Sequence, residues 1–224
     1  MEEPKRFKFN NSVLVIPFFL VFTIWLVYLI EIKFIFNFNK FGVLPRNFSG
    51  LKGVFFSPFI HSSTSHLINN SIPLFVLTSS LFFFYNKIAP KILIIGTLLT
   101  GLLTWIIARE AYHIGASGVV YLLFSFIFFS GIIRKHFRLT ALSLAVIFLY
   151  GSMIWYVFPI KEKISWEGHL SGFMVGLILA IVYKNSGPQK PIHIFKETEF
   201  DLQFDEEGNF APKNEVDTED ITNN

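Results

Sequence analysis

Six long apolar stretches dominate this sequence and constrain its fold more than any other feature. They run over about residues 12–30, 65–85, 92–108, 117–133, 139–157 and 167–183. A helix needs roughly 20 apolar residues to cross a bilayer, and within lipid it satisfies its own backbone hydrogen bonds. We therefore predict an all-α polytopic membrane protein, a bundle of six transmembrane helices with a long first outer loop.

The composition agrees with a membrane protein. Hydrophobic residues make up 52% of the 224 residues, and 29 residues are Phe, a more apolar balance than in ordinary soluble domains. The first stretch is too long for a signal-peptide core and lacks a small-residue cleavage site, so we expect it to remain as a helix. The chain has no cysteine, which excludes disulfides, thiolate metal sites and a cysteine nucleophile.

Charge divides the chain into three parts. Residues 1–11 are polar and basic, residues 12–184 hold the apolar stretches, and residues 185–224 hold ten of the sixteen acidic residues. We predict a cytoplasmic N-terminal segment, a six-helix membrane domain, and an acidic, disordered cytoplasmic tail.

Basic residues also predict the orientation. Lys and Arg are dense in the N-terminal segment and in the turns at 86–91 and 134–138, where acids are almost absent. By the positive-inside rule these turns and both termini are cytoplasmic, so the second, fourth and sixth stretches begin at the outer face. No organelle transit sequence is evident, and we expect a bacterial cytoplasmic membrane. The basic charge is explained without a nucleic-acid partner.

A serine among very small residues begins the fourth apolar stretch. In Gly115-Ala116-Ser117-Gly118 the hydroxyl lies at a helix start, where free N–H groups and the helix dipole favour an oxyanion. The neighbouring glycines let a backbone approach closely. Because small residues also serve helix packing in membranes, packing alone is an alternative for this motif.

A histidine within a glycine-rich helix start begins the sixth stretch. His169 is followed at i+3 and i+7 by Gly172 and Gly176, which form a flat stripe for a close helix neighbour. The small-residue face beginning at Ser117 is the natural neighbour, and His169 would then act as the base for that serine. A histidine satisfied by a backbone carbonyl is the alternative.

Four further polar residues are candidates for supporting roles. His66 and Asn70 are four residues apart and share a helix face, so they could donate to an oxyanion beside the Ser117 N–H or bond across helices. Tyr121 lies one turn after Ser117 and could support the imidazole or pack in the core. His61 could orient a water or hold the first loop.

The histidines do not form a recognisable metal motif. A metalloprotease helix carries two histidines four residues apart, and the position four after His66 is Asn70. We predict no metal and no other cofactor.

Three separated motifs, taken together, resemble the rhomboid family of intramembrane serine proteases over about residues 12–184. The motifs are His61 with His66-x-x-x-Asn70, Gly115-x-Ser117-Gly118-x-x-Tyr121, and His169-x-x-Gly172-x-x-x-Gly176. Many bacterial members carry a Trp-Arg pair in the first loop, where the nearest basic feature here is Pro45-Arg46.

The resemblance implies a bundle built around the fourth helix, with a water-accessible site below the outer surface. It implies Ser117 as nucleophile, His169 as base, His66 and Asn70 as oxyanion donors, and Tyr121 packed against His169. The implied activity is hydrolysis of peptide bonds in transmembrane protein substrates through an acyl-enzyme, so the expected partners are these substrates and the lipid bilayer. The oligomeric state is not predicted.

Two other functions compete with proteolysis. A non-catalytic rhomboid-like chaperone would recognise client helices and would not need Ser117 or His169. A small transporter with a histidine proton relay would need acidic residues within the helices, and the apolar stretches hold almost none.

Overall fold

The computed structural model describes residues 7, 9–160, 164–190, 200–205 and 207–211. The chain divides into two compact units, Met1–Lys190 and Pro191–Asn224. The predicted 1–11 segment and acidic tail lie largely outside the described residues. In the second unit, the described part forms a short 3-10 helix, η5 (Asp201–Gln203), and an isolated bridge between Phe204 and Phe210.

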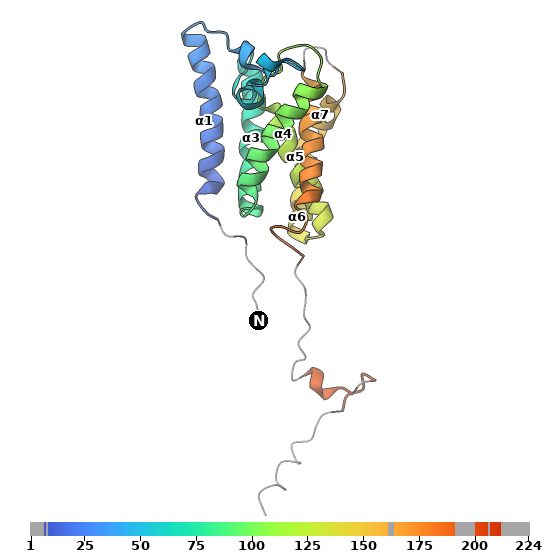
Figure 1. Ribbon diagram of the computed structural model, residues 1–224. Coiled ribbons are helices and arrows are strands. Elements are labelled where there is room, and N and C mark those ends of the chain that lie inside the picture. Colours follow the sequence, from blue (N-terminus) through green and yellow to red (C-terminus); the bar gives the residue numbers. More distant parts are fainter. Residues whose placement is uncertain (1–6, 8, 161–163, 191–199, 206, 212–224) are drawn as a thin grey trace, which may run out of the picture. The chain divides into compact units, whose positions relative to one another are not determined.

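The first unit is a bundle of α-helices, and no strand occurs among the residues described (Figure 1). The helices are α1 (Ser12–Lys33), α2 (Gly53–Phe56), α3 (Thr64–Phe84), α4 (Ala89–Ile107), α5 (Ser117–Arg134), α6 (Phe137–Tyr150) and α7 (Trp166–Val182). In Figure 1, α3, α5 and α7 all begin at the same end of the bundle.

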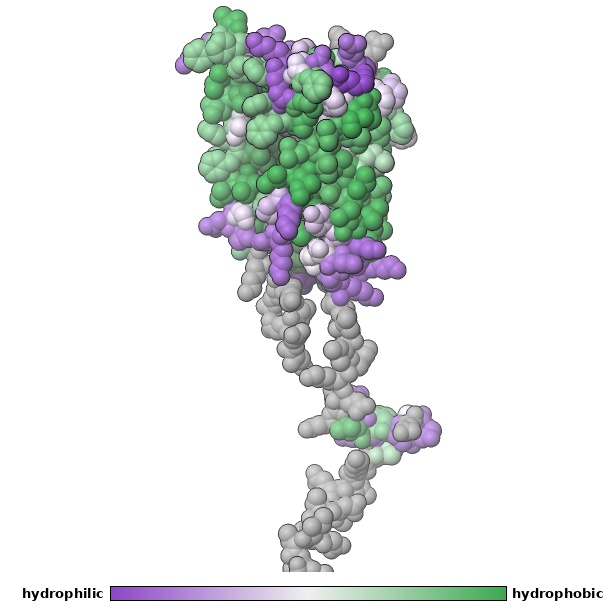
Figure 2. All heavy atoms as spheres, viewed as in Figure 1, coloured by the Kyte–Doolittle hydropathy of each residue, from purple (hydrophilic) through white to green (hydrophobic). Residues whose placement is uncertain are grey.

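The surface of the first unit is that of a membrane protein. Figure 2 shows a broad hydrophobic belt between two hydrophilic rims. Five spans in the described chain are long and apolar enough to cross a membrane: α1, α3, α4, α5 and the stretch Phe137–Val157, while α7 is a shorter apolar helix of 17 residues. The predicted all-α membrane class is confirmed, and the sixth predicted span is the short one.

Helix α5 is the centre of the bundle. Of its apolar window 67% is buried, against 17% for α1 and for the span that contains α6. It packs most extensively against α7. A Cβ added at Gly172 would collide with the Gly118 carbonyl, and one at Gly176 would collide with the Leu122 carbonyl. The two helices therefore touch through their backbones, which only glycine permits.

The fifth predicted helix ends earlier than expected. We predicted one helix over about 139–157, but α6 ends at Tyr150 and continues as a 3-10 helix, η4 (Gly151–Val157). Gly151 has low helix propensity, and Pro159 forces the preceding Phe158 into an extended conformation with ψ of 158°. The carbonyl groups near the end of η4 are therefore left without α-helical partners.

The long connection after α1 is more ordered than a structureless loop. It contains 3-10 turns η1 (Asn39–Phe41), η2 (Phe48–Gly50) and η3 (Ser57–Phe59) together with α2. Arg46 donates from Nη1 to the Ala108 carbonyl at 2.7 Å, and its backbone N–H bonds the Trp105 carbonyl at 3.0 Å. The loop thus caps the C-terminus of α4.

A buried arginine ties the other end of α5 to the residues after α7. Arg134 is 6% exposed. Its guanidinium donates to Ser130 Oγ at 2.8 Å and to the carbonyls of Tyr183 at 2.6 Å, Lys184 at 3.0 Å and Pro188 at 3.0 Å. One side chain therefore donates to three main-chain carbonyls in the segment that follows α7.

Candidate active site

Ser117 and His169 lie within hydrogen-bond distance. Ser117 Oγ is 2.9 Å from His169 Nε2. Ser117 is the first residue of α5 and His169 is the fourth residue of α7. The close backbone contact at Gly172 holds the two helix starts together, so residues 52 positions apart in sequence form one polar pair.

The hydrogen bond of the second ring nitrogen of His169 determines which of the two nitrogens carries the proton. Nδ1 lies 2.9 Å from the Tyr156 carbonyl oxygen in η4. A carbonyl can only accept, so Nδ1 carries the proton and Nε2 is the lone-pair nitrogen that accepts from the Ser117 hydroxyl. The imidazole is therefore already in the form that a general base requires.

Tyr121 lies flat against His169. The ring centroids are 4.3 Å apart and the planes are inclined by 12°. The Tyr121 hydroxyl donates to the Met153 carbonyl at 2.7 Å. Both the His169 ring and the Tyr121 ring that covers it are thus bonded to carbonyls of η4.

His66 and Asn70 lie opposite Gly115. A Cβ on Gly115 would be 2.7 Å from His66 Nε2 and 3.6 Å from Asn70 Nδ2, and Gly115 has φ of +109°, which favours glycine. His66 Nδ1 is 3.3 Å from Ser62 Oγ. Asn70 is 5% exposed, and its Nδ2 has no hydrogen-bond partner among the described residues.

His61 holds the segment that leads into α5. Its Nε2 accepts from the Ala116 N–H at 3.4 Å, and the Gly115 N–H donates to the Ser57 carbonyl at 2.9 Å. The two histidine rings of the first loop and α3, His61 and His66, are 5.0 Å apart. Burial, and then the neighbouring His66, lower the pKa of His61 to about 4, so His61 is neutral at physiological pH.

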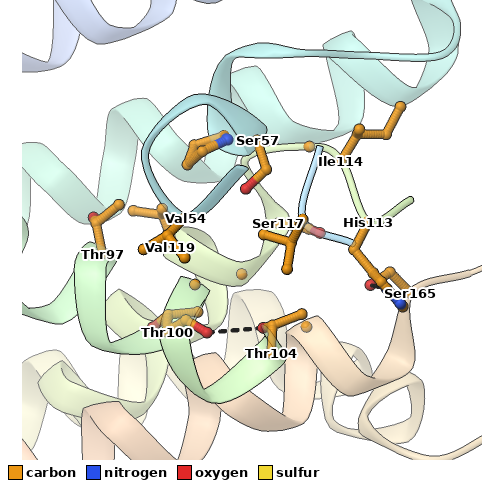
Figure 3. Close-up of a pocket in the computed structure, with 16 residues that line it drawn as sticks. Val54, Ser57, Thr97, Thr100, Thr104, His113, Ile114, Ser117, Val119 and Ser165 are labelled. Atoms are coloured by element: carbon orange, nitrogen blue, oxygen red, sulfur yellow. Dashed lines mark hydrogen bonds between the residues drawn. The ribbon is translucent and has the colours of Figure 1, made fainter. Parts of the chain in front are cut away.

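A narrow cavity lies beside Ser117 (Figure 3). Its volume is about 30 Å³, room for a water molecule. Four hydroxyl-bearing residues are among those that line it: Ser57, Thr97, Thr100 and Thr104. Thr100 Oγ1 is buried and has no protein partner among the described residues.

Sequence reasoning missed two contacts at the start of α7. Arg109 Nη1 pairs with Glu167 Oε1 at 3.2 Å, and the Glu167 side chain is 3% exposed. His113 Nδ1 lies 2.6 Å from Ser165 Oγ. No local pattern signals either contact, because the partners are more than 50 residues apart. Among the described residues, no three His, Asp or Glu side chains are grouped to hold a metal ion.

Comparison with known proteins identifies the family of the bundle. The rhomboid domain model matches residues 49–186. An uncharacterized protein of Mycobacterium bovis and one of Mycobacterium tuberculosis are each 32% identical over 169 residues, which cover 69% of this chain and 68% of theirs. An uncharacterized protein of Mycobacterium leprae is 29% identical over 161 residues, which cover 66% of this chain and 61% of its own. With its apolar helices and a family match over most of its length, this integral membrane protein belongs to the rhomboid family.

Proposed function

We propose that this protein is an intramembrane serine endopeptidase that cleaves transmembrane protein substrates with a Ser117–His169 dyad. The observation that carries the proposal is the 2.9 Å contact between Ser117 Oγ and His169 Nε2. The contact gains its meaning from Nδ1, whose bond to the Tyr156 carbonyl leaves Nε2 as the acceptor.

Acylation follows from this geometry. His169 Nε2 takes the proton of Ser117 Oγ as the oxygen attacks the scissile carbonyl carbon, giving a tetrahedral oxyanion. The intermediate collapses when the imidazolium returns that proton to the leaving amine nitrogen, and an acyl-enzyme ester on Ser117 remains. The Tyr156 carbonyl stabilises the imidazolium by accepting from Nδ1 throughout.

The oxyanion has three candidate donors. The Ser117 N–H is free because it lies in the first turn of α5. Asn70 Nδ2 is buried and unpartnered among the described residues, and His66 Nε2 faces Gly115. Donors already in place before charge develops stabilise a transition state without reorganisation. A buried N–H₂ without a partner is costly in a resting protein, and a ligand oxyanion would satisfy it.

Deacylation needs a water near the ester. The cavity beside Ser117 has room for one, and the unpartnered Thr100 Oγ1 would bind it. The water attacks the ester carbonyl and gives its proton to His169 Nε2. Collapse of the second tetrahedral intermediate returns that proton to Ser117 Oγ and releases the acid.

We place the site near the outer face of a bacterial cytoplasmic membrane, with both termini cytoplasmic. The basic turns at 86–91 and 134–138 lie at the opposite ends of α3, α4, α5 and α6 from the site, in accord with the positive-inside rule. Substrates would be cleaved near their outer ends, where helix-destabilising residues expose a peptide bond to attack.

Labelling with a fluorophosphonate probe tests the proposal. Detergent-purified wild type should form a covalent adduct, and Ser117→Ala and His169→Ala should not. Thermal unfolding of each variant serves as the folding control. Absence of labelling in folded wild type would favour the non-catalytic chaperone, and labelling that survives Ser117→Ala would identify a different nucleophile.

A further inference from the structure

A second histidine–serine pair lies four residues before the first in each segment, with the histidine and the serine exchanged between the segments. His113 is four residues before Ser117, and Ser165 is four residues before His169. His113 Nδ1 is 2.6 Å from Ser165 Oγ. Both side chains border the cavity next to Ser117, where Figure 3 shows Ser165 beside His113.

The direction of this bond follows from the other nitrogen of His113. Nε2 lies 3.0 Å from the Arg109 carbonyl oxygen. A carbonyl only accepts, so Nε2 carries the proton and Nδ1 accepts from the Ser165 hydroxyl. His113 is 5% exposed and its backbone exchanges two 2.9 Å hydrogen bonds with Val43. His113 is therefore held rigidly in place, and Ser165 is hydrogen-bonded to it.

Ser165 gives up its usual local role to make this contact. It is the N-cap residue of α7, yet its side chain makes no cap hydrogen bond. Serine at an N-cap normally accepts from an N–H of the first turn. Here its hydroxyl is directed across to the segment before α5. Two residues later, Glu167 is tied to Arg109 in the same segment.

These contacts act at the end of the helix pair where the dyad lies. After His169 in the chain, the close backbone contacts of Gly172 and Gly176 fix α7 against α5. Before His169, the side-chain contacts of Ser165 and Glu167 hold the first turn of α7. The position of His169 is thus constrained by contacts on both sides of it in the chain.

We propose that His113 and Ser165 form a positioning pair that sets the distance between the nucleophile and its base. The inference rests on the proposed function. Neither side chain takes part in the chemistry: the pair holds the start of α7 so that His169 Nε2 stays within reach of Ser117 Oγ. A displacement of about 1 Å at a reacting group can cost roughly a hundredfold in rate. The bond between His113 and Ser165, four residues from the dyad in each segment, should therefore affect the reaction rate.

The test uses the rate of fluorophosphonate labelling, measured over a range of probe concentrations. Ser165→Ala removes the donor, and His113→Phe keeps the ring volume without an acceptor. Each should lower the maximal labelling rate by about tenfold to a hundredfold, with the half-saturating probe concentration unchanged. Ser165→Thr retains the hydroxyl donor, and His113→Asn offers an amide oxygen as acceptor near the position of Nδ1. Both variants should recover most of the wild-type rate.

Two comparisons separate positioning from general stability. Ser143→Ala is the matched control, because Ser143 is also a buried serine, bonded to the Leu139 carbonyl at 2.9 Å in α6. It should label at the wild-type rate. The double variant of Ser165→Ala and His113→Phe should label no more slowly than the worse single variant, because each single substitution already removes the bond between Ser165 and His113.

The outcomes distinguish the two proposals. Folded wild type that fails to label refutes the proposed function, and the positioning role falls with it. Wild type that labels, with folded Ser165→Ala labelling equally fast, overturns the positioning pair alone. An equal rate loss in Ser143→Ala, or additive losses in the double variant, would also overturn it.

Discussion

His169 and Tyr121 stack with ring centroids 4.3 Å apart and planes 12° from parallel. The hydroxyl of Tyr121 is held by the Met153 carbonyl, and Nδ1 of His169 is held by the Tyr156 carbonyl. Both carbonyls belong to η4, so one short 3-10 helix orients the base and the ring that restricts its rotation. In the proposed enzyme, the orientation of the base depends on α6 and η4 as well as on α7.

Replacing Tyr121 should separate the roles of ring and hydroxyl. Tyr121→Phe keeps the stacked ring and loses only the bond to the Met153 carbonyl, so labelling of Ser117 should slow by about threefold. Tyr121→Leu also loses the stacking and should slow labelling by about tenfold or more. Labelling rates and melting temperatures should be measured together. Equal rates for the two variants would contradict a role for the ring.

Asn70→Leu should lower activity without lowering stability. If Asn70 Nδ2 donates to the oxyanion, hydrolysis of a transmembrane substrate should fall by about a hundredfold, mostly in kcat. Because that N–H₂ is buried without a partner among the described residues, removing it relieves a desolvation cost of about 1–3 kcal/mol, and the melting temperature should stay level or rise.

The control for this prediction is Asn69→Leu. Asn69 is exposed and one position along the same helix, so its replacement should leave kcat within about twofold. A loss of kcat in Asn69→Leu comparable to that in Asn70→Leu would contradict the assigned oxyanion donor.

Gly172→Ala should force α5 and α7 apart. The added methyl group would collide with the Gly118 carbonyl, a backbone atom that cannot rotate away. We expect a loss of about 1–3 kcal/mol in stability and a larger relative loss in labelling, because Ser117 is adjacent to Gly118. Gly96→Ala is the control: its methyl group would meet the end of the Leu122 side chain, which can move, and no backbone atom is among its nearest neighbours. Similar effects of the two substitutions would refute the close-contact explanation.

Arg134→Leu should destabilise the bundle without changing the dyad. The substitution removes the guanidinium bonds to the carbonyls of Tyr183, Lys184 and Pro188. Tyr183 keeps the bond from the Ser186 N–H and Lys184 keeps the bond from Gln189 Nε2, so we expect a cost of about 1–3 kcal/mol. Thermal unfolding should show the loss, while the labelling rate of the folded fraction should match wild type. Arg138→Leu, at a neighbouring but exposed position, should have little effect on either. An unchanged melting temperature of Arg134→Leu would contradict a stabilising role for these arginine contacts.

Stability should fall as pH drops below about 6.5, partly through His61. Its pKa in the folded protein is about 4, below the ordinary value of 6.5, so the unfolded chain binds more protons between these values. Stability is thus fully present above pH 6.5 and is lost as pH falls toward 4, by on the order of 2 kcal/mol near pH 5. Burial lowers the pKa of His113 in the same direction.

Melting curves between about pH 7 and pH 5 provide the measurement. The melting temperature of wild type should fall over this range, and that of His61→Gln should fall less because glutamine does not titrate. An identical pH dependence in the two proteins would show that His61 does not contribute.

Apolar length and periodicity were sufficient to predict the helical membrane class and where most helices lie. The predicted start of α4 at about 92 was late, because Pro90 is compatible with the first turn of the helix. Propensity also failed to predict that the helix ending at Tyr150 would change into a 3-10 helix. Such ends depend on Gly151 and Pro159 acting together with tertiary contacts.

The side chains of the candidate site could be picked out from the sequence because each motif lies at a helix start and carries polar groups unusual in lipid. The Tyr156 carbonyl could not be picked out in this way, since every residue has a carbonyl. The contacts of Ser165 with His113 and of Glu167 with Arg109 join segments more than 50 residues apart, and no spacing rule links such partners. The sequence indicated the candidate reacting groups but not the contacts that hold them in place.

The partner of His169 Nδ1 is a main-chain oxygen, and this changes what determines the chemistry. No substitution at position 156 deletes that oxygen, so alanine scanning would detect Ser117 and His169 but not the carbonyl that bonds the histidine. The oxygen is available because the helix ends before Pro159: one more α-helical turn would engage it in an i to i+4 bond. In the proposed enzyme, the length of the segment that contains α6 and η4 therefore matters as much as its side chains, and an insertion in α6 would remove the partner of the proposed base while leaving every side chain of the site intact.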